Sequence, residues 1–221
     1  MLPFLKKFRR FIIALYNSIM PVKISYSQSA EDKMVWELTK IKLKPEYIYI
    51  DVGANQPTQI SNTYLFYRKG FRGIVIEPNH ELSVLFRRFR PGDIHLTAGC
   101  SDKCSLGKFK LSDSTSVSGF GDSVKLRIKG YSWVPMLTVD EIWLSAGEEK
   151  TVFLLSIDTE GFDLQVLKGA MKTLQNTICL VIETSADNAE EINTILKGYQ
   201  FELITKTENN YIYLNQNLVN K

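Results

Sequence analysis

Short apolar runs alternate with segments of helical periodicity along most of the chain. Apolar runs of this length, bounded by turn residues, are typical of buried strands. Strands that are apolar throughout and that alternate with helices indicate a parallel sheet with both faces covered. The runs that predict strands are residues 47–52, 73–77, 94–98, 151–158, 178–183, 201–205 and 211–214.

The segments between these runs predict helices. The periodicity favours helices at residues 29–41, 58–69, 81–90, 162–174 and 187–197, and after a capping box at Thr138–Glu141. Only a turn separates the last two strands, which should therefore pair antiparallel at the sheet edge. The pattern predicts an α/β fold with one Rossmann-like domain. We expect a mainly parallel seven-stranded sheet with an antiparallel edge strand and helices on both faces.

Residues 102–136 interrupt the alternation. This segment is rich in Ser, Gly and Lys, and it contains two short candidate strands at residues 107–111 and 124–128. An insertion of this kind in a regular α/β pattern is a common place for a substrate pocket. We expect the segment, with Tyr131 and Trp133, to shape that pocket.

The first 24 residues form a separate unit before the domain at residues 25–221. The helical spacing there combines apolar positions at Leu5, Phe8, Phe11, Ile12, Leu15 and Ile19 with basic ones at Lys6, Lys7, Arg9 and Arg10. Two interpretations stand: a helix that packs on its own domain or on a second subunit, and an amphipathic helix on an anionic membrane surface. No apolar run is long enough to span a membrane, and no signal-peptide cleavage site is clear.

Composition narrows the function classes. The net charge of +3 is too small for a typical nucleic-acid-binding protein. The cysteines are Cys100, Cys104 and Cys179, an odd set that forms neither a disulfide framework nor a four-ligand zinc site. We therefore expect a cytoplasmic protein, with contact at the inner face of the membrane if the N-terminal helix binds lipid.

Acidic residues follow the first two predicted strands. Asp51 ends the first strand and could accept from a charged amino group, while Gly53 permits a tight turn and Asn55 follows it. Glu77 ends the second strand, where an acid can accept both hydroxyls of a ribose. The three spaced glycines of a dinucleotide loop are missing, which disfavours an NAD-dependent enzyme.

The later strands end in further polar residues. Ser101 and Asp102 follow the third strand, where an adenine lies in such sheets, and Asp102 could accept from its amino group. Asp158 and Glu160 follow the fourth strand, and Glu183 ends the fifth. These acids could provide a base, orient a substrate or hold a metal, or one could bind a cationic cofactor while the others cap helices. We predict no metal.

The motifs together resemble the FkbM methyltransferases in order and spacing over residues 25–214. The resemblance rests on residues 27–32, 51–55, 61–73, 77–78, 98–102, 134–140 and 156–161. It implies S-adenosylmethionine as the methyl donor and a hydroxyl as the acceptor. Gln56-Pro57 and Gly99-Cys100 depart from the usual pattern of the family, but neither removes a recognisable acid.

The predicted function is O-methylation of a hydroxyl on a glycan or another polar small molecule. The predicted cofactor-binding residues are Asp51, Gly53, Asn55, Glu77, Ser101, Asp102 and Asp158, and the predicted catalytic residues are Asp158 and Glu160. The alternative is a protein that binds the cofactor but has lost catalysis. Differential thermal shift with S-adenosylmethionine and NAD would separate the first prediction from an NAD-dependent enzyme.

Overall fold

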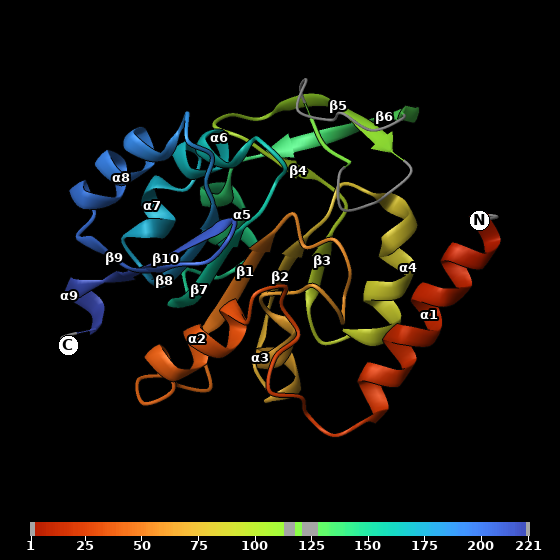
Figure 1. The fold of residues 1–221 in the computed structure, drawn as a ribbon. Helices are drawn as coiled ribbons and strands as arrows, with labels where there is room; N and C mark the ends of the chain where they lie inside the picture. Colours follow the sequence, from red (N-terminus) through yellow and green to blue (C-terminus); the bar gives the residue numbers. More distant parts are fainter. Residues whose placement is uncertain (1–2, 113–117, 121–127, 220–221) are drawn as a thin grey trace.

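A seven-stranded sheet and a smaller three-stranded sheet organise the protein. The computed structural model describes residues 3–112, 118–120 and 128–219. The strand order of the large sheet is β3-β2-β1-β7-β8-β10-β9 (Figure 1). Its strands are β1 Ile48–Val52, β2 Arg72–Ile76, β3 Ile94–Leu96, β7 Val152–Ile157, β8 Thr177–Glu183, β9 Phe201–Lys206 and β10 Asn210–Asn215.

The predicted fold class is confirmed. β1 pairs parallel with both β2 and β7, and β7 pairs parallel with β8, so this half of the sheet is parallel. β10 runs antiparallel to β8 and to β9, which forms the antiparallel pair expected at the sheet edge. β10, the last strand in the sequence, lies between β8 and β9, and β9 forms the edge of the sheet. The chain leaves β1 toward β2 and β3 on one side of the sheet and later returns to place β7 on the other side of β1. The strand order therefore reverses at β1, which makes this a topological switch point.

Helices cover both faces of the large sheet. On one face lie α5 Val139–Ala146, α6 Asp163–Lys168, α7 Met171–Leu174 and α8 Ala189–Gly198. On the other lie α2 Glu31–Thr39, α3 Tyr64–Arg68 and α4 His80–Phe89. α9 Gln216–Val219 follows the last strand, and α1 Pro3–Ile19 lies beside α4 (Figure 1).

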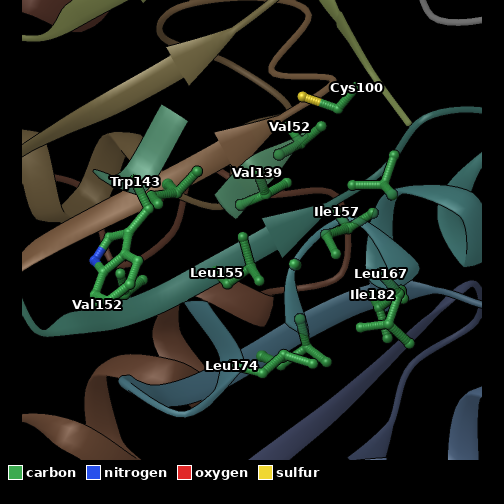
Figure 2. Close-up of a cluster of buried hydrophobic side chains, with 14 of the residues drawn as sticks. Val52, Cys100, Val139, Trp143, Val152, Leu155, Ile157, Leu167, Leu174 and Ile182 are labelled. Carbon is green, nitrogen blue, oxygen red and sulfur yellow. The ribbon is translucent and has the colours of Figure 1, made fainter. Parts of the chain in front are cut away.

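The core explains why the sheet strands are apolar throughout. All six residues of β7 are buried, because Leu155 and Ile157 pack toward α5 and α6 (Figure 2) while Phe153 packs toward the opposite helices. Truncating a fully buried leucine such as Leu155 to alanine costs about 2–5 kcal/mol. The strands of the parallel half are therefore fixed in position, and their carboxyl ends form a rigid edge.

The smaller sheet comes from the segment that interrupts the α/β pattern. It consists of β4 Gly99–Cys100, β5 Ser105–Ser112 and β6 Ile128–Leu137. The expected strand at 107–111 lies within β5. The expected strand at 124–128 lies outside the described residues except for Ile128, which begins β6.

Two predicted helices are shorter than expected. Only residues 64–68 of the predicted helix at 58–69 are helical, because Ile60 adopts a left-handed φ of 49° that breaks the helix. The helix predicted at 162–174 is divided into α6 and α7 around Gly169. A Cβ on Gly169 would lie 2.1 Å from the carbonyl oxygen of Ser101, so the chain approaches the end of β4 closely there.

The capping predictions have different outcomes. The capping box after β6 is confirmed, because the Thr138 hydroxyl accepts from the Glu141 amide at 3.1 Å. The prediction that the first domain helix begins at Ser29 is wrong. α2 begins at Glu31 after a left-handed Ala30, and the Ser29 amide donates to the Glu31 carboxylate at 2.9 Å.

Candidate active site

A cavity opens at the carboxyl ends of β1, β2 and β7, at the topological switch point. It encloses about 730 Å³, including space open to solvent. We call it the main cavity. The described residues that line it are Gln28, Val52, Gly53, Asn55, Ile60, Ile76, Glu77, Pro78, Ala98, Gly99, Cys100, Phe109, Ser118, Phe120, Asp158, Thr159 and Glu160.

Gly53 forms the floor where β1 and β7 meet. Its φ is 80°, a conformation that costs side-chain-bearing residues free energy. A Cβ at this position would lie 1.8 Å from the carbonyl oxygen of Asp158. The Asp158 amide in turn donates to the Val52 carbonyl at 3.0 Å. Glycine therefore allows two backbone segments to approach closely, and the space above them stays open for a ligand.

The Glu77 carboxylate is held in a fixed orientation at the cavity wall. Its Oε2 accepts from the Asn55 amide at 2.8 Å, and its Oε1 accepts from the Asn79 amide at 2.7 Å. Each oxygen retains a lone pair for a further donor. Burial raises the pKa of Glu77 to about 7, against the effect of the two amides. A ligand that offers two adjacent hydroxyls would supply donors to both oxygens.

Asn55 presents a buried acceptor in the same wall. Its φ of 48° is left-handed, a conformation that Asn tolerates better than most residues. Its side-chain oxygen is buried without a hydrogen-bond partner among the described residues. Buried polar atoms in native proteins are almost always paired. The free oxygen therefore fits a site completed by the polar groups of a ligand.

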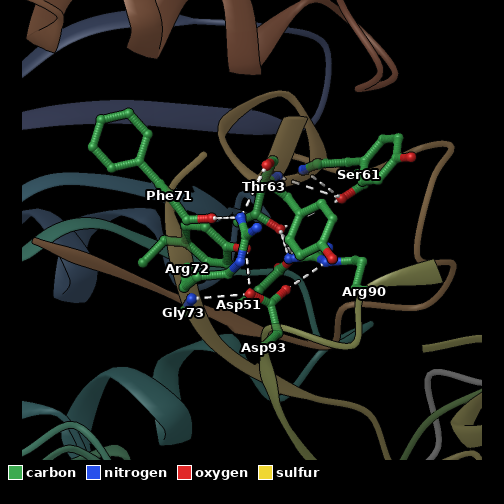
Figure 3. A network of polar contacts seen from close by, with 11 residues as sticks. Asp51, Ser61, Thr63, Phe71, Arg72, Gly73, Arg90 and Asp93 are labelled. Atoms are coloured by element: carbon green, nitrogen blue, oxygen red, sulfur yellow. Dashed lines mark hydrogen bonds and ion pairs between the residues drawn. The ribbon is translucent and has the colours of Figure 1, made fainter. Parts of the chain in front are cut away.

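The structure places Asp51 behind the cavity wall. It is buried, and it accepts a hydrogen bond from the hydroxyl of Thr63 (Figure 3). The same hydroxyl accepts from the Arg90 guanidinium at 3.0 Å, and Arg90 forms a fully buried ion pair with Asp93 at 2.6 Å. Burial raises the pKa of Asp51, although Arg90 opposes the shift. Asp51 is not among the described residues that line the main cavity, and its predicted contact with a ligand amino group stays a prediction.

Four carboxyl groups, those of Asp158, Glu160, Asp163 and Glu183, interact near the ends of β7 and β8. Burial, followed by the negative charge of Glu183, raises the pKa of Asp158 well above its usual range. Burial and the charges of Asp163 and Glu160 raise the pKa of Glu183 to about 7. A side-chain hydrogen bond joins Asp158 and Glu183. Because two neighbouring carboxylates repel each other, the second member of such a pair to ionise holds its proton more tightly than an isolated carboxyl, so the fully ionised pair is a stronger base than a single carboxylate.

Asp163 shapes the loop that carries Glu160. One of its oxygens accepts from the Thr159 amide at 2.8 Å and from the Thr159 hydroxyl at 2.9 Å. The other accepts from the Gly161 amide at 3.2 Å. Between these contacts Glu160 adopts a left-handed φ of 56°, which is uncommon for a glutamate. Asp163 was not among the residues predicted from the sequence. The sequence feature that could have indicated it is a carboxylate soon after the end of β7, where it can accept hydrogen bonds from the loop amides.

A second, more polar hollow adjoins the main cavity. The two share Gln28, Ile60, Asp158 and Glu160, so they form one continuous site. We call the second part the polar hollow. Its other described lining residues are Asn62, Glu183, Asn209 and Asn210. The lining offers only carboxylates, amides and one isoleucine, which suits a ligand rich in hydroxyl groups.

Glu31 fixes the orientation of Asn210 in the polar hollow. The Asn210 amide nitrogen donates to the Glu31 carboxylate at 3.1 Å, and the Asn210 side-chain oxygen is buried without a partner among the described residues. Burial would raise the pKa of Glu31, but hydrogen bonds, including the one from Asn210, hold it below its usual value. The ionised Glu31 therefore leaves the Asn210 oxygen as an acceptor.

The insertion contributes different residues to the site from those expected. Phe109, Ser118 and Phe120 line the main cavity. Tyr131 and Trp133 are exposed, with 52% and 67% of their surfaces accessible, and do not line it among the described residues. The expectation for these two aromatics is wrong, because residues alternate along β6 and Val134 and Met136 occupy the inward positions.

Ser101 and Asp102 lie just beyond the cavity wall at the end of β4. Ala98, Gly99 and Cys100 line the main cavity, whereas the Ser101 hydroxyl donates to the Asp102 carboxylate at 3.1 Å. Their predicted contact with an adenine stays a prediction. Among the described residues, no group of three His, Cys, Asp or Glu side chains is placed to hold a metal ion. All three cysteines are free thiols.

The comparisons with known proteins identify the family. The model of the methyltransferase FkbM domain matches residues 51–212, from Asp51 in β1 to Ile212 in β10. The chain belongs to the FkbM methyltransferase family. In its large sheet the last strand, β10, is inserted antiparallel between β8 and the outermost strand β9. No curated protein matches the chain.

One of the solved structures that match the chain is precorrin-6y C5,15-methyltransferase from Geobacter metallireducens GS-15, which is 10% identical in sequence with a TM-score of 0.42. The similarity covers 88% of this chain and 92% of that chain. Family membership is carried by the sequence match and not by this likeness.

Proposed function

We propose that the protein is an S-adenosylmethionine-dependent O-methyltransferase that acts on a hydroxyl of a glycan or another polar small molecule. The observation that carries the proposal is the environment of Glu77. This carboxylate is buried at the end of β2, and two backbone amides orient it toward a cavity that continues into the acids of β7 and β8.

The residues of the main cavity fit the cofactor. Glu77 would accept both ribose hydroxyls, and the unpaired Asn55 oxygen would accept from a polar group of the cofactor. Gly53 leaves room for close approach to the backbone. Asp51, buried behind the cavity wall, would favour a cationic end of the ligand there. S-adenosylmethionine supplies an electrophilic methyl group on a sulfonium centre.

The acids of the polar hollow prepare the acceptor. Asp158, whose pKa burial and Glu183 raise, would accept the proton of the acceptor hydroxyl as the hydroxyl oxygen bonds to the methyl carbon. The bond from that carbon to the sulfonium sulfur would break in the same step and leave the sulfur as a neutral thioether. Glu160 would accept from a neighbouring hydroxyl and orient the acceptor. Holding the two reactants in line supplies much of the rate acceleration in such a transfer.

The polar hollow supports a polyhydroxylated acceptor. Asn210 offers a buried oxygen, and Asp158, Glu160 and Glu183 add carboxylate oxygens. Hydroxyl groups donate well to such acceptors. A phosphate or carboxylate on the acceptor would meet like charge in this hollow and is disfavoured.

The test is incubation of the protein with S-adenosylmethionine labelled in its methyl group and a panel of free sugars and oligosaccharides. Label is expected on a hydroxyl of one class of acceptor, detected by mass spectrometry. Saturable cofactor binding without label transfer to any panel member or to cell extracts would favour the alternative of an inactive cofactor-binding protein. Stabilisation by NAD and not by S-adenosylmethionine would contradict both.

A further inference from the structure

α1 packs on the domain with its polar side. Asn17 is buried, and its amide nitrogen donates to the Thr58 carbonyl at 2.8 Å. The Arg68 guanidinium donates to the carbonyl of Asn17 and, at 2.7 Å, to the carbonyl of Met20. Further along the helix, Lys7 forms an ion pair with Glu81 of α4 at 3.1 Å. These contacts fix which side of α1 faces the domain.

Most apolar residues of α1 face away from the domain, whereas Phe11 packs on Phe89 of α4 with the ring centroids 5.5 Å apart. Leu5, Phe8, Ile12, Leu15 and Ile19 recur at alternating spacings of three and four, which places them in one line along a helix. We call this line the outward stripe. Residues two positions apart are rotated by about 200° and lie on nearly opposite sides. Exposed Ile12 therefore lies opposite buried Ala14, and exposed Leu15 opposite buried Asn17.

The outward stripe is a continuous exposed apolar surface. Its residues have accessible fractions of 37% to 71%, although all belong to apolar types. The helix is about 25 Å long at a rise of about 1.5 Å per residue. Met20, Val22 and Ile24, which follow the helix in sequence, are also exposed. Contiguous patches of this kind on a folded domain mark sites of contact with a membrane or another protein.

The charge of α1 distinguishes between a membrane and a second copy of the chain as the partner of the outward stripe. α1 contains Lys6, Lys7, Arg9 and Arg10 and no acidic residue. Lys7 and Arg9 are exposed, Lys7 within its ion pair with Glu81, whereas Lys6 and Arg10 are half-buried. Parallel pairing with a second copy would bring the two basic halves together. Antiparallel pairing would place each basic half against the residues from Leu15 to Ile19, which offer no negative charge. A bilayer with anionic headgroups offers an apolar interior and a negative surface together.

We infer that α1 docks the protein on the surface of an anionic lipid bilayer. The outward stripe enters the boundary between headgroups and acyl chains, about 5–10 Å deep for helices of this type. The domain is held above the surface through the buried polar side of α1. Among the described residues no helix is long and apolar enough to cross a membrane. The inference concerns a surface apart from the proposed catalytic site and does not depend on it.

The test is flotation of the full chain with two kinds of vesicle, phosphatidylcholine alone and phosphatidylcholine mixed with phosphatidylglycerol. We expect binding to the mixed vesicles that weakens as salt is raised, because salt screens the basic residues. Ile12→Glu should weaken this binding at least about tenfold, because a carboxylate would enter the apolar boundary. Ile12 is exposed, so the variant should keep the melting temperature of the wild type.

Ile41→Glu is the matched control. Ile41 is 89% exposed and follows α2, which lies away from α1 in Figure 1. The control makes the same change of residue and charge, and it should bind vesicles as the wild type does. Equal binding by all three proteins, or no binding by the wild type, would overturn the inference. Analytical ultracentrifugation tests whether the outward stripe instead pairs with a second copy of the chain. A wild-type dimer that does not bind vesicles, and that dissociates in Ile12→Glu, would overturn the inference in favour of such pairing.

Discussion

The backbone of Gly53 lies against the carbonyl oxygen of Asp158, so closely that a Cβ on Gly53 would be 1.8 Å from that oxygen. This contact joins the ends of β1 and β7 under the main cavity. Gly53 also has a φ of 80°. Both the close approach and the backbone conformation require glycine at this position.

Gly53→Ala should therefore be strongly destabilising, by about 2 kcal/mol or more, since it combines backbone strain with a steric clash. Chemical denaturation measures this change in the free energy of unfolding. Gly70→Ala is the matched control, because Gly70 has a φ of 98° but no atom within 4 Å of the added Cβ. Gly70→Ala should show the strain alone. Equal losses in the two variants would mean that the contact with Asp158 does not matter.

The affinity for S-adenosylmethionine should depend on pH through Glu77. Burial raises the pKa of this carboxyl to about 7 in the free protein. The ribose hydroxyls donate to the ionised form, so bound cofactor lowers this pKa. Affinity should then rise about tenfold from pH 6 to pH 8, as the ionised fraction grows from about a tenth to about nine tenths, and level off above.

Isothermal titration calorimetry across this pH range measures the effect. Glu77→Gln removes the titrating group and should flatten the rise, even if it binds more weakly. A profile that keeps the same slope in Glu77→Gln would assign the pH dependence to another group, such as Glu183, whose pKa is also about 7.

Asp158→Asn should lower kcat about 100- to 10,000-fold, the range for loss of a general base. Cofactor affinity should change much less, because the proposed role of Asp158 is toward the acceptor. Single-turnover kinetics with saturating cofactor measure the loss. Asp187→Asn, at an exposed position after β8, is the control and should behave as the wild type. A loss of affinity without a loss of turnover would move Asp158 to the cofactor site.

Glu183→Gln tests the coupling between the two acids. The charge of Glu183 helps to raise the pKa of Asp158. Its removal should lower the pKa of Asp158 and shift the acidic limb of the kcat profile to lower pH. An unshifted limb would show that Asp158 does not act as the titrating base.

Much of the fold and part of the site could be predicted from local sequence. Glu77 and Asp158 were predictable because each ends an apolar strand, and the carboxyl ends of parallel strands meet at one edge. Gln28 and Asn210 were not predictable in this way. Asn210 reaches the site through Glu31, which lies far from it in sequence. Such tertiary contacts leave no periodic signal in the chain.

The N-terminal helix illustrates the same limit. Its spacing predicted an amphipathic helix, and the structure contains it as α1. The usual expectation for such a helix is that the apolar side packs inward. Contacts of Asn17 and Arg68 hold the polar side inward instead. Which face of a helix is buried depends on the side chains of the domain that lie next to the helix. Those neighbours are set by the folded structure and not by the helix sequence alone.

The most direct test of the proposed function is calorimetric titration of the protein with S-adenosylmethionine, for the wild type and Glu77→Ala. The wild type should bind one molecule per chain, and Glu77→Ala should bind at least about tenfold more weakly, because the ribose hydroxyls lose a charged acceptor. Glu202→Ala, at an exposed position on β9, should bind as the wild type does. No binding by the wild type, or equal affinity in Glu77→Ala, would contradict the assignment of this cavity to the cofactor.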